Sequence, residues 1–481
     1  MNVEWVSRLP GSARVGLYFA LQQAIGSRVW RRWRQFQSWT RLSSEQLKRE
    51  IDLQLAKLLT SAIRESAFYR KLGLRLDSRA SATQFLKHFP ILTREQIRDR
   101  FSELVTDALR SEITSPANVS SKRYDWLVVK TGGTTGTPTS VVHDKSFRDW
   151  GRTTRLFAQR LCGFPLGTPF FRLWGSEQDL LQQQEKLDRR VLRNLLGEIP
   201  MNAFRAKEAE LVQHYETIRN QSGVRHLMAY VDAAVSLATF IEDRNLPKPR
   251  LRTVMACAGT VTQEWRQILE RVFGAEVFDK YGSRECADIA CECSAHHGLH
   301  VFSPSVFVEV VDDEGRECAP GQTGRILVTL LHNLSFPMIR YQIGDLGVWA
   351  EPAPCACGLA FPRLLNLQGR ADDMLVTEDG TRLTSVFIRH FVGVSLNRQL
   401  IREWQFEQTG PGAFIFRYIP LQSDGLDDNL KGIESSFRKA LGSSAKIEFQ
   451  AVPEIPSAPT GKTLWIVNHW KRSAKQSPIL T

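Results

Sequence analysis

A glycine-rich segment that follows a short apolar run places the strongest constraint on how this chain can fold. Residues 131–139 read Thr-Gly-Gly-Thr-Thr-Gly-Thr-Pro-Thr, directly after Trp126-Leu-Val-Val-Lys130. Glycines let a backbone approach a ligand closely, and threonine hydroxyls donate hydrogen bonds to phosphate oxygens. A glycine-rich loop after a strand therefore indicates a polyphosphate site built from backbone N–H groups. The alternative is a Thr/Gly turn without a ligand.

The segment differs from two common phosphate-binding motifs. No Gly-Lys-Ser/Thr ends it, and it lacks the G-x-G-x-x-G of dinucleotide folds. It is, however, the first of five motifs. The other four follow in the order Tyr281-Gly-Ser-Arg-Glu285, Tyr341-Gln-Ile-Gly-Asp345, Gly369-Arg-Ala-Asp-Asp373 and Pro456-Ser-Ala-Pro-Thr-Gly-Lys462.

In these five motifs the chain resembles the adenylate-forming superfamily of acyl-CoA synthetases and adenylation domains. It looks most like the phenylacetate–CoA ligase-like branch, including its capsular-polysaccharide-type relatives, from about residue 50 to 470. The resemblance implies an ATP-dependent, AMP-forming acid ligase. Such an enzyme converts a carboxylic acid to an acyl-adenylate and pyrophosphate, and then transfers the acyl group to coenzyme A with release of AMP.

The order of sequence patterns predicts an α/β fold with two catalytic domains. Short apolar strands alternate with amphipathic stretches between residues 120 and 350, which indicates β-sheets flanked by helices. We expect a basic aromatic N-terminal helical extension at 1–50 and a large multi-layer adenylation domain, which binds ATP and the acid, at 51–371. A small mobile α+β domain that carries the catalytic lysine is expected at 372–481, an ordinary size for a unit with its own core.

The resemblance assigns the nucleotide contacts residue by residue. Tyr281 would stack on adenine, as an aromatic face suits a base. Asp345 would accept hydrogen bonds from the ribose hydroxyls, and Arg370 would contact the nucleotide and act in catalysis. The remaining nucleotide-binding residues are Thr131, Gly132, Gly133, Thr134, Thr135, Gly136, Gly282 and Ser283.

Three further residues are assigned to the chemistry itself. Glu285 would hold Mg²⁺, which prefers hard oxygen ligands. Lys462, in a Pro/Gly-rich loop, would neutralise charge between the substrate carboxylate and the α-phosphate. Asp372 would be the hinge about which the small domain rotates.

Two positions depart from the pattern of the superfamily. Thr139 stands where most members have a lysine, which puts more demand on Lys462 and Mg²⁺. Gln342 stands where an arginine usually follows the tyrosine. Two outcomes are open: Arg340, two positions earlier, replaces the missing arginine, or the contact is lost.

The acid pocket would be lined by Trp174, Tyr230, Ala258 and Gly259. Relatives often have an Ala-Glu pair where Ala258-Gly259 stands, so we expect the glycine to remove a carboxylate and enlarge the space. The aromatic residues suggest an apolar or aromatic acid. Core packing explains the same residues almost as well.

Cysteine spacing indicates a metal site. The pairs Cys291-Glu-Cys293 and Cys355-Ala-Cys357, with His300 near the first pair, resemble a metal-binding variant within this ligase branch. We expect Cys293, His300, Cys355 and Cys357 to hold a structural Zn²⁺, since zinc favours four thiolate or imidazole ligands. The alternative is a set of buried free cysteines.

The net charge of +12 is concentrated at the N-terminus. Residues 1–50 hold nine Arg or Lys and three Glu, and residues 28–37 mix arginines with aromatics. The tryptophans dock on the protein body, or the helix contacts an anionic membrane or a partner protein. We expect no nucleic-acid partner, because no nucleic-acid-binding signature accompanies the charge. The apolar run at 15–25 is too short to span a bilayer, and the expected location is the cytoplasm.

Two other functions compete with an acid–CoA ligase. One is a ligase that transfers the acyl group to an amine or hydroxyl, for example on a saccharide or metabolite. The other is a degenerate nucleotide-binding relative, which is disfavoured because Glu285, Asp345, Arg370 and Lys462 are all present.

Overall fold

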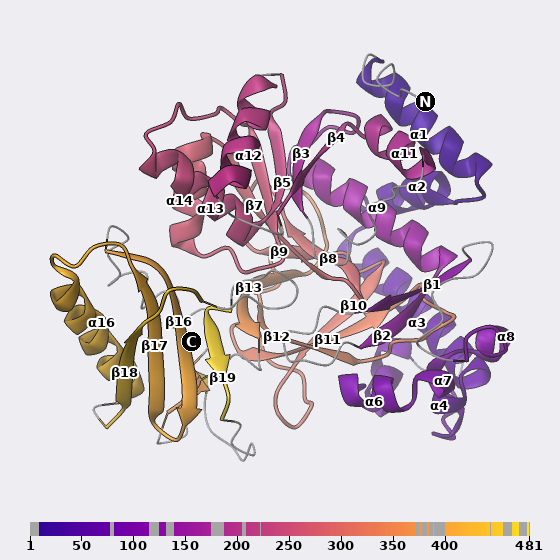
Figure 1. The fold of residues 1–481 in the computed structure, drawn as a ribbon. Coiled ribbons are helices and arrows are strands. Elements are labelled where there is room, and N and C mark those ends of the chain that lie inside the picture. The colour runs from indigo at the N-terminus through magenta and orange to yellow at the C-terminus, as the bar shows by residue number, and fades with distance from the viewer. Residues whose placement is uncertain are drawn as a thin grey trace.

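A mixed sheet of eleven strands forms the centre of the computed structural model (Figure 1). The structure describes residues 9–76, 81–114, 125–130, 139–174, 187–203, 208–221, 223–370, 375–377, 382–383, 388, 400–442, 444–455, 464–470 and 479–480. In spatial order the strands are β10 (Val306–Val311), β11 (Thr323–Leu330), β12 (Tyr341–Trp349), β13 (Arg363–Arg370), β9 (Leu299–Val301), β8 (Ala287–Glu292), β7 (Glu276–Ser283), β6 (Thr253–Cys257), β5 (His226–Tyr230), β3 (Phe170–Trp174) and β4 (Glu198–Asn202).

The direction of the strands changes at β7. Strands β4, β3, β5, β6 and β7 are parallel neighbours, whereas β7 pairs antiparallel with β8 and the antiparallel pattern continues to β10. The central parallel strands β5 and β6 are buried along most of their length, because helices cover both faces of a parallel sheet.

Three helices cover one face of the parallel strands: α12 (Glu208–Asn220), α13 (Val231–Asp243) and α14 (Gln263–Phe273) (Figure 1). Leu227, Val254 and Val277 point toward them, as alternate residues of a strand face the same side. Thr262 caps α14 by accepting a hydrogen bond from the Trp265 backbone N–H, and Gly274 ends the helix in the left-handed conformation.

Helix α9 (Lys145–Leu161) covers the opposite face, on the side of α1 (Gly11–Ala24), α2 (Val29–Trp39) and α11 (Leu187–Leu195) (Figure 1). The Asp144 side chain caps α9 by accepting a hydrogen bond from the Phe147 backbone N–H. Leu156 and Phe157 of α9 share one hydrophobic core with Met255 of β6.

The aromatic residues of α2 dock on the protein body. Trp33, Phe36 and Trp39 are buried, and the Phe36 ring lies 4.7 Å from that of Phe157 in α9. The Trp39, Trp150 and His332 rings stack within about 10° of parallel. Of the two arrangements expected for this segment, docking is therefore found for these three side chains.

A long helix, α3 (Ser44–Glu65), and a series of short helices lead from this extension to the first strand pair. The short helices are α4 (Ala67–Arg70), α5 (Ala82–Phe85), the 3₁₀ helix η2 (Leu86–His88), α6 (Arg94–Asp99), α7 (Phe101–Leu104) and α8 (Asp107–Arg110). Ser43 and Gln46 form a reciprocal capping box at the start of α3. Thr93 and Gln96 form a second box at α6.

The antiparallel pair β1 (Trp126–Lys130) and β2 (Ser140–Asp144) brackets the glycine-rich motif. Lys130 and Ser140 are register partners, so the strand residues that flank the motif lie next to each other. The Asn333 side chain donates a hydrogen bond to the Val142 carbonyl and ties this hairpin to the loop after β11.

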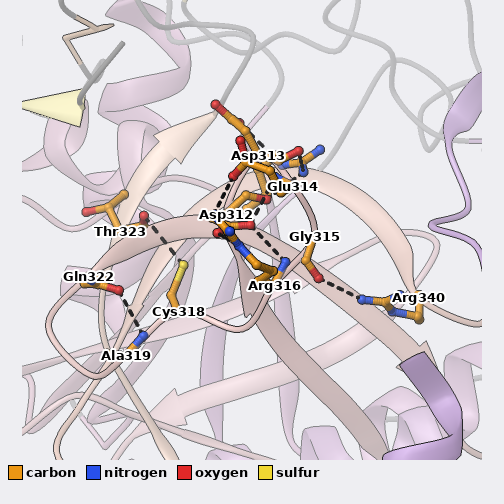
Figure 2. Close-up of polar contacts among 11 residues, drawn as sticks. Asp312, Asp313, Glu314, Gly315, Arg316, Cys318, Ala319, Gln322, Thr323 and Arg340 are labelled. Carbon is orange, nitrogen blue, oxygen red and sulfur yellow. Dashed lines mark hydrogen bonds and ion pairs between the residues drawn. The ribbon is translucent and has the colours of Figure 1, made fainter. Parts of the chain in front are cut away.

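The loop between β10 and β11 is held by a local polar network (Figure 2). Asp312 accepts hydrogen bonds from the backbone N–H groups of Glu314 and Arg316 and from the Arg316 guanidinium. Arg340 approaches the Gly315 carbonyl at 3.4 Å from the other side. Strands β10 and β11 form an antiparallel hairpin, with Val308 opposite Val328.

The C-terminal strands form a second sheet with its own core. The order is β18 (Lys446–Ala451), β17 (Ala413–Pro420), β16 (Ile401–Gly410) and β19 (Ile466–Asn468), and α16 (Leu426–Leu441) packs on it (Figure 1). A third, small sheet contains β14 (Leu375–Val376), β15 (Arg382–Leu383) and β20 (Ile479–Leu480). Trp465 contacts both cores, with its ring 5.2 Å from Trp404 and 6.2 Å from Trp265 of α14.

The predicted α/β fold class is confirmed by this arrangement of a large sheet flanked by helices and a smaller C-terminal sheet. Among the helices in the described residues, none combines the length and apolar character that a membrane-spanning helix requires.

The docking of α2 predicts a large difference between two of its aromatic residues. Phe36→Ala should lower the free energy of unfolding by about 3–5 kcal/mol, because it empties a fully buried site. Trp30→Ala should lower it by less than about 1 kcal/mol, because the Trp30 residue is 45% exposed. Urea unfolding of both variants measures this, and equal losses would contradict the docked arrangement.

Candidate active site

The ends of two strands bring Tyr281 of β7 and Asp345 of β12 together. The Tyr281 hydroxyl donates a hydrogen bond of 2.7 Å to Asp345 Oδ2. Burial, and then the Asp345 carboxylate, raises the pKa of Tyr281 well above its ordinary value, so the phenol stays protonated. The residue expected to stack on adenine and the residue expected to bind ribose are therefore in direct contact.

Glu285, the expected magnesium ligand, lies in the turn between β7 and β8 and is 5% exposed. Its Oε1 accepts a hydrogen bond of 3.2 Å from the Tyr341 hydroxyl. Burial, followed by the Glu285 carboxylate, raises the pKa of Tyr341, which keeps this donor protonated. The carboxylate is thus oriented by a rigid, buried partner.

His143 of β2 fixes the backbone of the same turn. Its Nε2 lies 2.9 Å from the Glu285 carbonyl oxygen. Because that oxygen only accepts, Nε2 carries the proton. Burial lowers the pKa of His143 to about 4, so the imidazole is neutral near pH 7. This contact links the hairpin that brackets the glycine-rich motif to the turn that carries Glu285.

Arg94, at the start of α6, brings a positive charge to the cluster. Its Nε donates a hydrogen bond of 3.3 Å to the Tyr341 hydroxyl, and its guanidinium also donates to the Ile343 carbonyl. Burial alone would lower the pKa of Arg94, but Tyr341 and then the Glu285 and Asp345 carboxylates raise it. Arg94, Tyr341 and Glu285 therefore form one chain of hydrogen bonds.

Several predicted residues fall outside the described part of the chain, namely Thr131, Gly132, Gly133, Thr134, Thr135, Gly136, Asp372 and Lys462. The backbone of Arg370 is described, and it is the register partner of Asp345 between β13 and β12. Gly282 and Ser283 end β7 beside Tyr281, and Ser283 Oγ accepts a hydrogen bond from the Cys286 backbone N–H.

The predicted acid-pocket residues lie at the carboxyl ends of the parallel strands β3, β5 and β6, with the Trp174 and Tyr230 rings 4.3 Å apart. Ala258 has a φ of 65°, a strained conformation of the kind that clusters at functional sites. The enlargement expected at Gly259 is not found, because Val231 occupies the place of a side chain there, only 2.6 Å from an added Cβ.

Arg340 does not take over the position of the arginine that Gln342 replaces. Its Nε lies 3.2 Å from each carboxylate oxygen of Glu309, and its Nη1 donates to the Phe89 carbonyl at 3.1 Å. Gln342 Oε1 accepts a hydrogen bond of 3.3 Å from Arg325. Both residues thus serve the β10–β12 region of the sheet.

A candidate metal centre lies apart from this cluster. The ligand atoms of Cys293, His300, Cys355 and Cys357 all lie within 4.8 Å of one another. The Cys293 and Cys355 sulfurs are 3.6 Å apart, and Cys357 Sγ is 3.3 Å from His300 Nε2. Tetrahedral zinc with bonds of about 2.0–2.3 Å would separate its ligands by about 3.5–3.8 Å, so the four residues fit a structural site.

His300 is prepared to act as a metal ligand. Its Nδ1 lies 3.1 Å from the Phe361 carbonyl oxygen and therefore carries the proton, which leaves the lone pair of Nε2 facing Cys357. Burial lowers the pKa of His300 to about 4, so the ring is neutral. The sequence prediction of these four ligands agrees with their geometry, and the bound metal remains a prediction.

Sequence reasoning did not assign Arg94, Tyr341 or His143 to the site. Tyr341 was within a quoted motif, and Arg94 ends the stretch Phe89-Pro-Ile-Leu-Thr-Arg94, which also resembles the ligase branch. Either motif could have suggested them. His143 carried no such signal, because its role depends on a contact across 142 residues of sequence.

Comparison with known proteins agrees with this geometry. Residues 375–469 match the family described as the CapK C-terminal domain. The chain is 22% identical over 416 residues to Protein CapK of Staphylococcus aureus, an alignment that covers 85% of this chain and 86% of CapK. It is 30% identical over 149 residues to a phenylacetate-coenzyme A ligase of Thermus thermophilus, covering 30% of this chain and 33% of that enzyme.

A solved structure of 2-hydroxyisobutyryl-CoA ligase in the postadenylation state matches with a TM-score of 0.69 and 17% identity, covering 89% of this chain and 90% of that one. The fold is therefore that of the adenylate-forming enzymes. The similarities to CapK and to phenylacetate-coenzyme A ligase confirm the resemblance to the phenylacetate–CoA ligase-like branch.

The metal centre predicts about one zinc per chain in protein purified without chelator. The double change Cys355→Ser with Cys357→Ser should remove the zinc and lower the melting temperature, because a structural metal contributes folding free energy. Cys318→Ser is the matched control, since this buried cysteine lies outside the cluster and should leave the zinc in place. Metal analysis that finds no zinc in the unaltered protein would exclude the site.

Proposed function

We propose that this chain is an AMP-forming acid ligase that adenylates a carboxylic acid with ATP and transfers the acyl group to coenzyme A. The observation that carries the proposal is the single cluster formed by Tyr281, Asp345, Glu285, Tyr341 and Arg94. The cluster combines an aromatic ring, a ribose-type acceptor and an oriented carboxylate. The similarity to phenylacetate-coenzyme A ligase supports coenzyme A as the acceptor.

In this proposal the protein acts mainly by positioning and charge neutralisation. Residues 131–136 hold the ATP phosphates, Tyr281 contacts adenine and Asp345 binds the ribose hydroxyls, with Arg370 on the neighbouring strand. Glu285 holds Mg²⁺, with the carboxylate aimed by Tyr341. When bound there, Mg²⁺ would supply positive charge beside the phosphate groups.

The small C-terminal domain, residues 372–481, delivers Lys462 to this site. The separate hydrophobic core around Phe406, Phe416 and Phe437 supports an independent unit. Residues 1–50 share their core with the large domain, 51–371. We place the hinge at Asp372. It lies two residues after Arg370, which ends β13 and is the strand partner of Asp345.

A ligase that acylates an amine or hydroxyl is the second prediction, and it shares the first half-reaction.

We also propose a cytoplasmic location. The partly exposed Trp30 and the arginines of α2 are the groups available for a membrane or protein contact, and salt-dependent binding to anionic vesicles tests that contact.

A pyrophosphate-exchange screen tests the proposed function. Carboxylic acids are offered singly with ATP and Mg²⁺, and each active acid is tested again with coenzyme A, an amine or a hydroxyl acceptor. Exchange with an acid and AMP release stimulated by coenzyme A support the proposal. Absence of exchange with every acid contradicts adenylation, whereas exchange that only an amine or hydroxyl acceptor drives to AMP favours the second prediction.

Removing the Tyr341 hydroxyl should show whether this group orients Glu285 or only stabilises the fold. Tyr341→Phe should raise the Mg²⁺ concentration needed for half-maximal pyrophosphate exchange about 10- to 100-fold. The reason is that a hydrogen bond to a charged group contributes about 1.5–3 kcal/mol. Tyr69→Phe is the matched control. Tyr69 is equally buried, but its hydroxyl bonds to the Pro337 carbonyl and the Ile339 N–H. A Mg²⁺ dependence that changes equally in both variants would contradict the role of Tyr341.

Two further variants should separate the half-reactions. Lys462→Ala should slow acyl-adenylate formation about 100- to 1,000-fold, equivalent to about 3–4 kcal/mol, and leave transfer from a supplied acyl-adenylate largely intact. Asp372→Pro should permit adenylation and block transfer, because proline fixes φ at the pivot. Single-turnover assays measure both steps. Equal slowing of both by Lys462→Ala would show that the lysine is structural or present at the site in both conformations.

A further inference from the structure

A buried ion pair lies beside the predicted acid pocket. Lys280, the residue directly before Tyr281 in β7, forms an ion pair with Asp288 of β8. The two side chains are only 6% and 11% exposed. Neither residue belongs to the nucleotide cluster around Glu285, and neither was singled out by the sequence motifs.

Strand register places Lys280 in one row with the pocket residues. Lys280 pairs with Cys257 of β6, and Cys257 pairs with Tyr230 of β5. Lys280 Nζ also lies 6.0 Å from the centre of the Trp174 ring. The row thus runs along the carboxyl ends of parallel strands, where open α/β sheets bind their ligands.

Stability does not account for this pair. Removing two charges from water costs several kcal/mol for each ion, and apolar residues of similar volume are often at least as stable in such places. Burial alone would lower the pKa of Lys280, but Asp288 more than offsets it and keeps that pKa above its ordinary value. The ammonium is therefore charged although the pair is buried.

The pair also has hydrogen-bonding capacity to spare. Asp288 Oδ2 is buried and accepts no hydrogen bond from any residue that the structure describes. An ammonium has three donors, of which one is directed at Asp288 Oδ1. The neighbouring Cys257 thiol donates to the Ala229 carbonyl and so leaves Oδ2 without a partner. A donor and an acceptor are thus available at one point.

We propose that Lys280 and Asp288 recognise a hydroxyl group on the acyl part of the substrate acid. The hydroxyl donates to Asp288 Oδ2 and accepts from the Lys280 ammonium, while the apolar part of the acid packs against Trp174 and Tyr230. Both residues determine specificity for the acid and take no part in the chemistry at its carboxylate. This inference rests on the proposed function and names the substrate class of that site.

The pair discriminates against two other polar substituents. A second carboxylate on the acid would be repelled by Asp288, and an ammonium would be repelled by Lys280. An acid without a polar substituent would leave Asp288 Oδ2 buried without a partner, and a buried polar group left unpaired is an effective way for a site to reject an analogue. A hydroxyl satisfies both partners with a single oxygen, which donates to Asp288 and accepts from Lys280.

Matched pairs of acids test the inference in pyrophosphate exchange with the full chain. The probes are phenylacetate and 4-hydroxyphenylacetate, benzoate and 3-hydroxybenzoate, and butyrate and 3-hydroxybutyrate. For at least one pair, the hydroxylated acid should have a kcat/KM on the order of 100-fold higher or more. The double variant Lys280→Met with Asp288→Asn, which removes both charges together, should bring that ratio close to one.

Two control variants distinguish a change in acid specificity from a loss of folding. Asp288→Asn alone, which preserves the shape of the side chain, should lower the same ratio at least tenfold and decides the question if the double variant does not fold. Lys431→Met with Asp428→Asn removes an exposed Lys–Asp pair of α16 and should leave the ratio unchanged.

Each outcome has one meaning. Preference for hydroxylated acids that is lost in the pocket variants and kept in the α16 control supports the inference. Exchange without such a preference, or a preference that the pocket variants retain, overturns the inference and leaves the ligase function standing. Absence of exchange with every acid overturns the proposed function, and the inference falls with it.

Discussion

The reversal of strand direction at β7 is the constraint on which the rest of the site depends. β7 runs parallel to β6 but antiparallel to β8, so the chain must turn back sharply after Ser283. Gly282 makes this close return feasible, since a side chain there would collide with the Ala287 carbonyl oxygen. As a result, one short turn places Glu285 on the side of Tyr341 and Asp288 beside Lys280. The residues proposed to contact the nucleotide and those proposed to contact the acid are thereby brought next to each other.

Buried charges in this molecule fall into two kinds, which their hydrogen bonds distinguish. Arg340 and Glu309 are satisfied by each other and by backbone carbonyls, and their pairing secures the loops around β10 and β12. Lys280 and Asp288 are equally buried but keep an unused acceptor. Since an unpaired polar group is costly in a protein interior, the second kind points to a ligand and the first to architecture.

Local patterns predicted local structure well. The alternation of strands and amphipathic stretches between residues 120 and 350 and the gathering of Cys293, His300, Cys355 and Cys357 agree with the structure, because each depends on spacing within short stretches or on a matched motif. Residues that act across the fold were not found this way: His143 meets the Glu285 backbone, and Arg340 meets Glu309 31 positions away. At Gly259 the expectation of extra space was wrong, because the side chain of Val231 fills that space. Val231 is the first residue of α13 and follows strand β5. Sequence spacing carries no information about such neighbours.

The position of Trp465 gives the molecule an optical property of its own. This indole lies three residues after Lys462 and touches Trp404 in the C-terminal sheet and Trp265 in α14 of the large domain. A rotation of the C-terminal sheet relative to the large domain must separate Trp465 from Trp265 while it keeps Trp404 as a neighbour. The emission of this indole cluster would therefore respond to the proposed rotation, and stopped-flow fluorescence can look for that response without any attached dye.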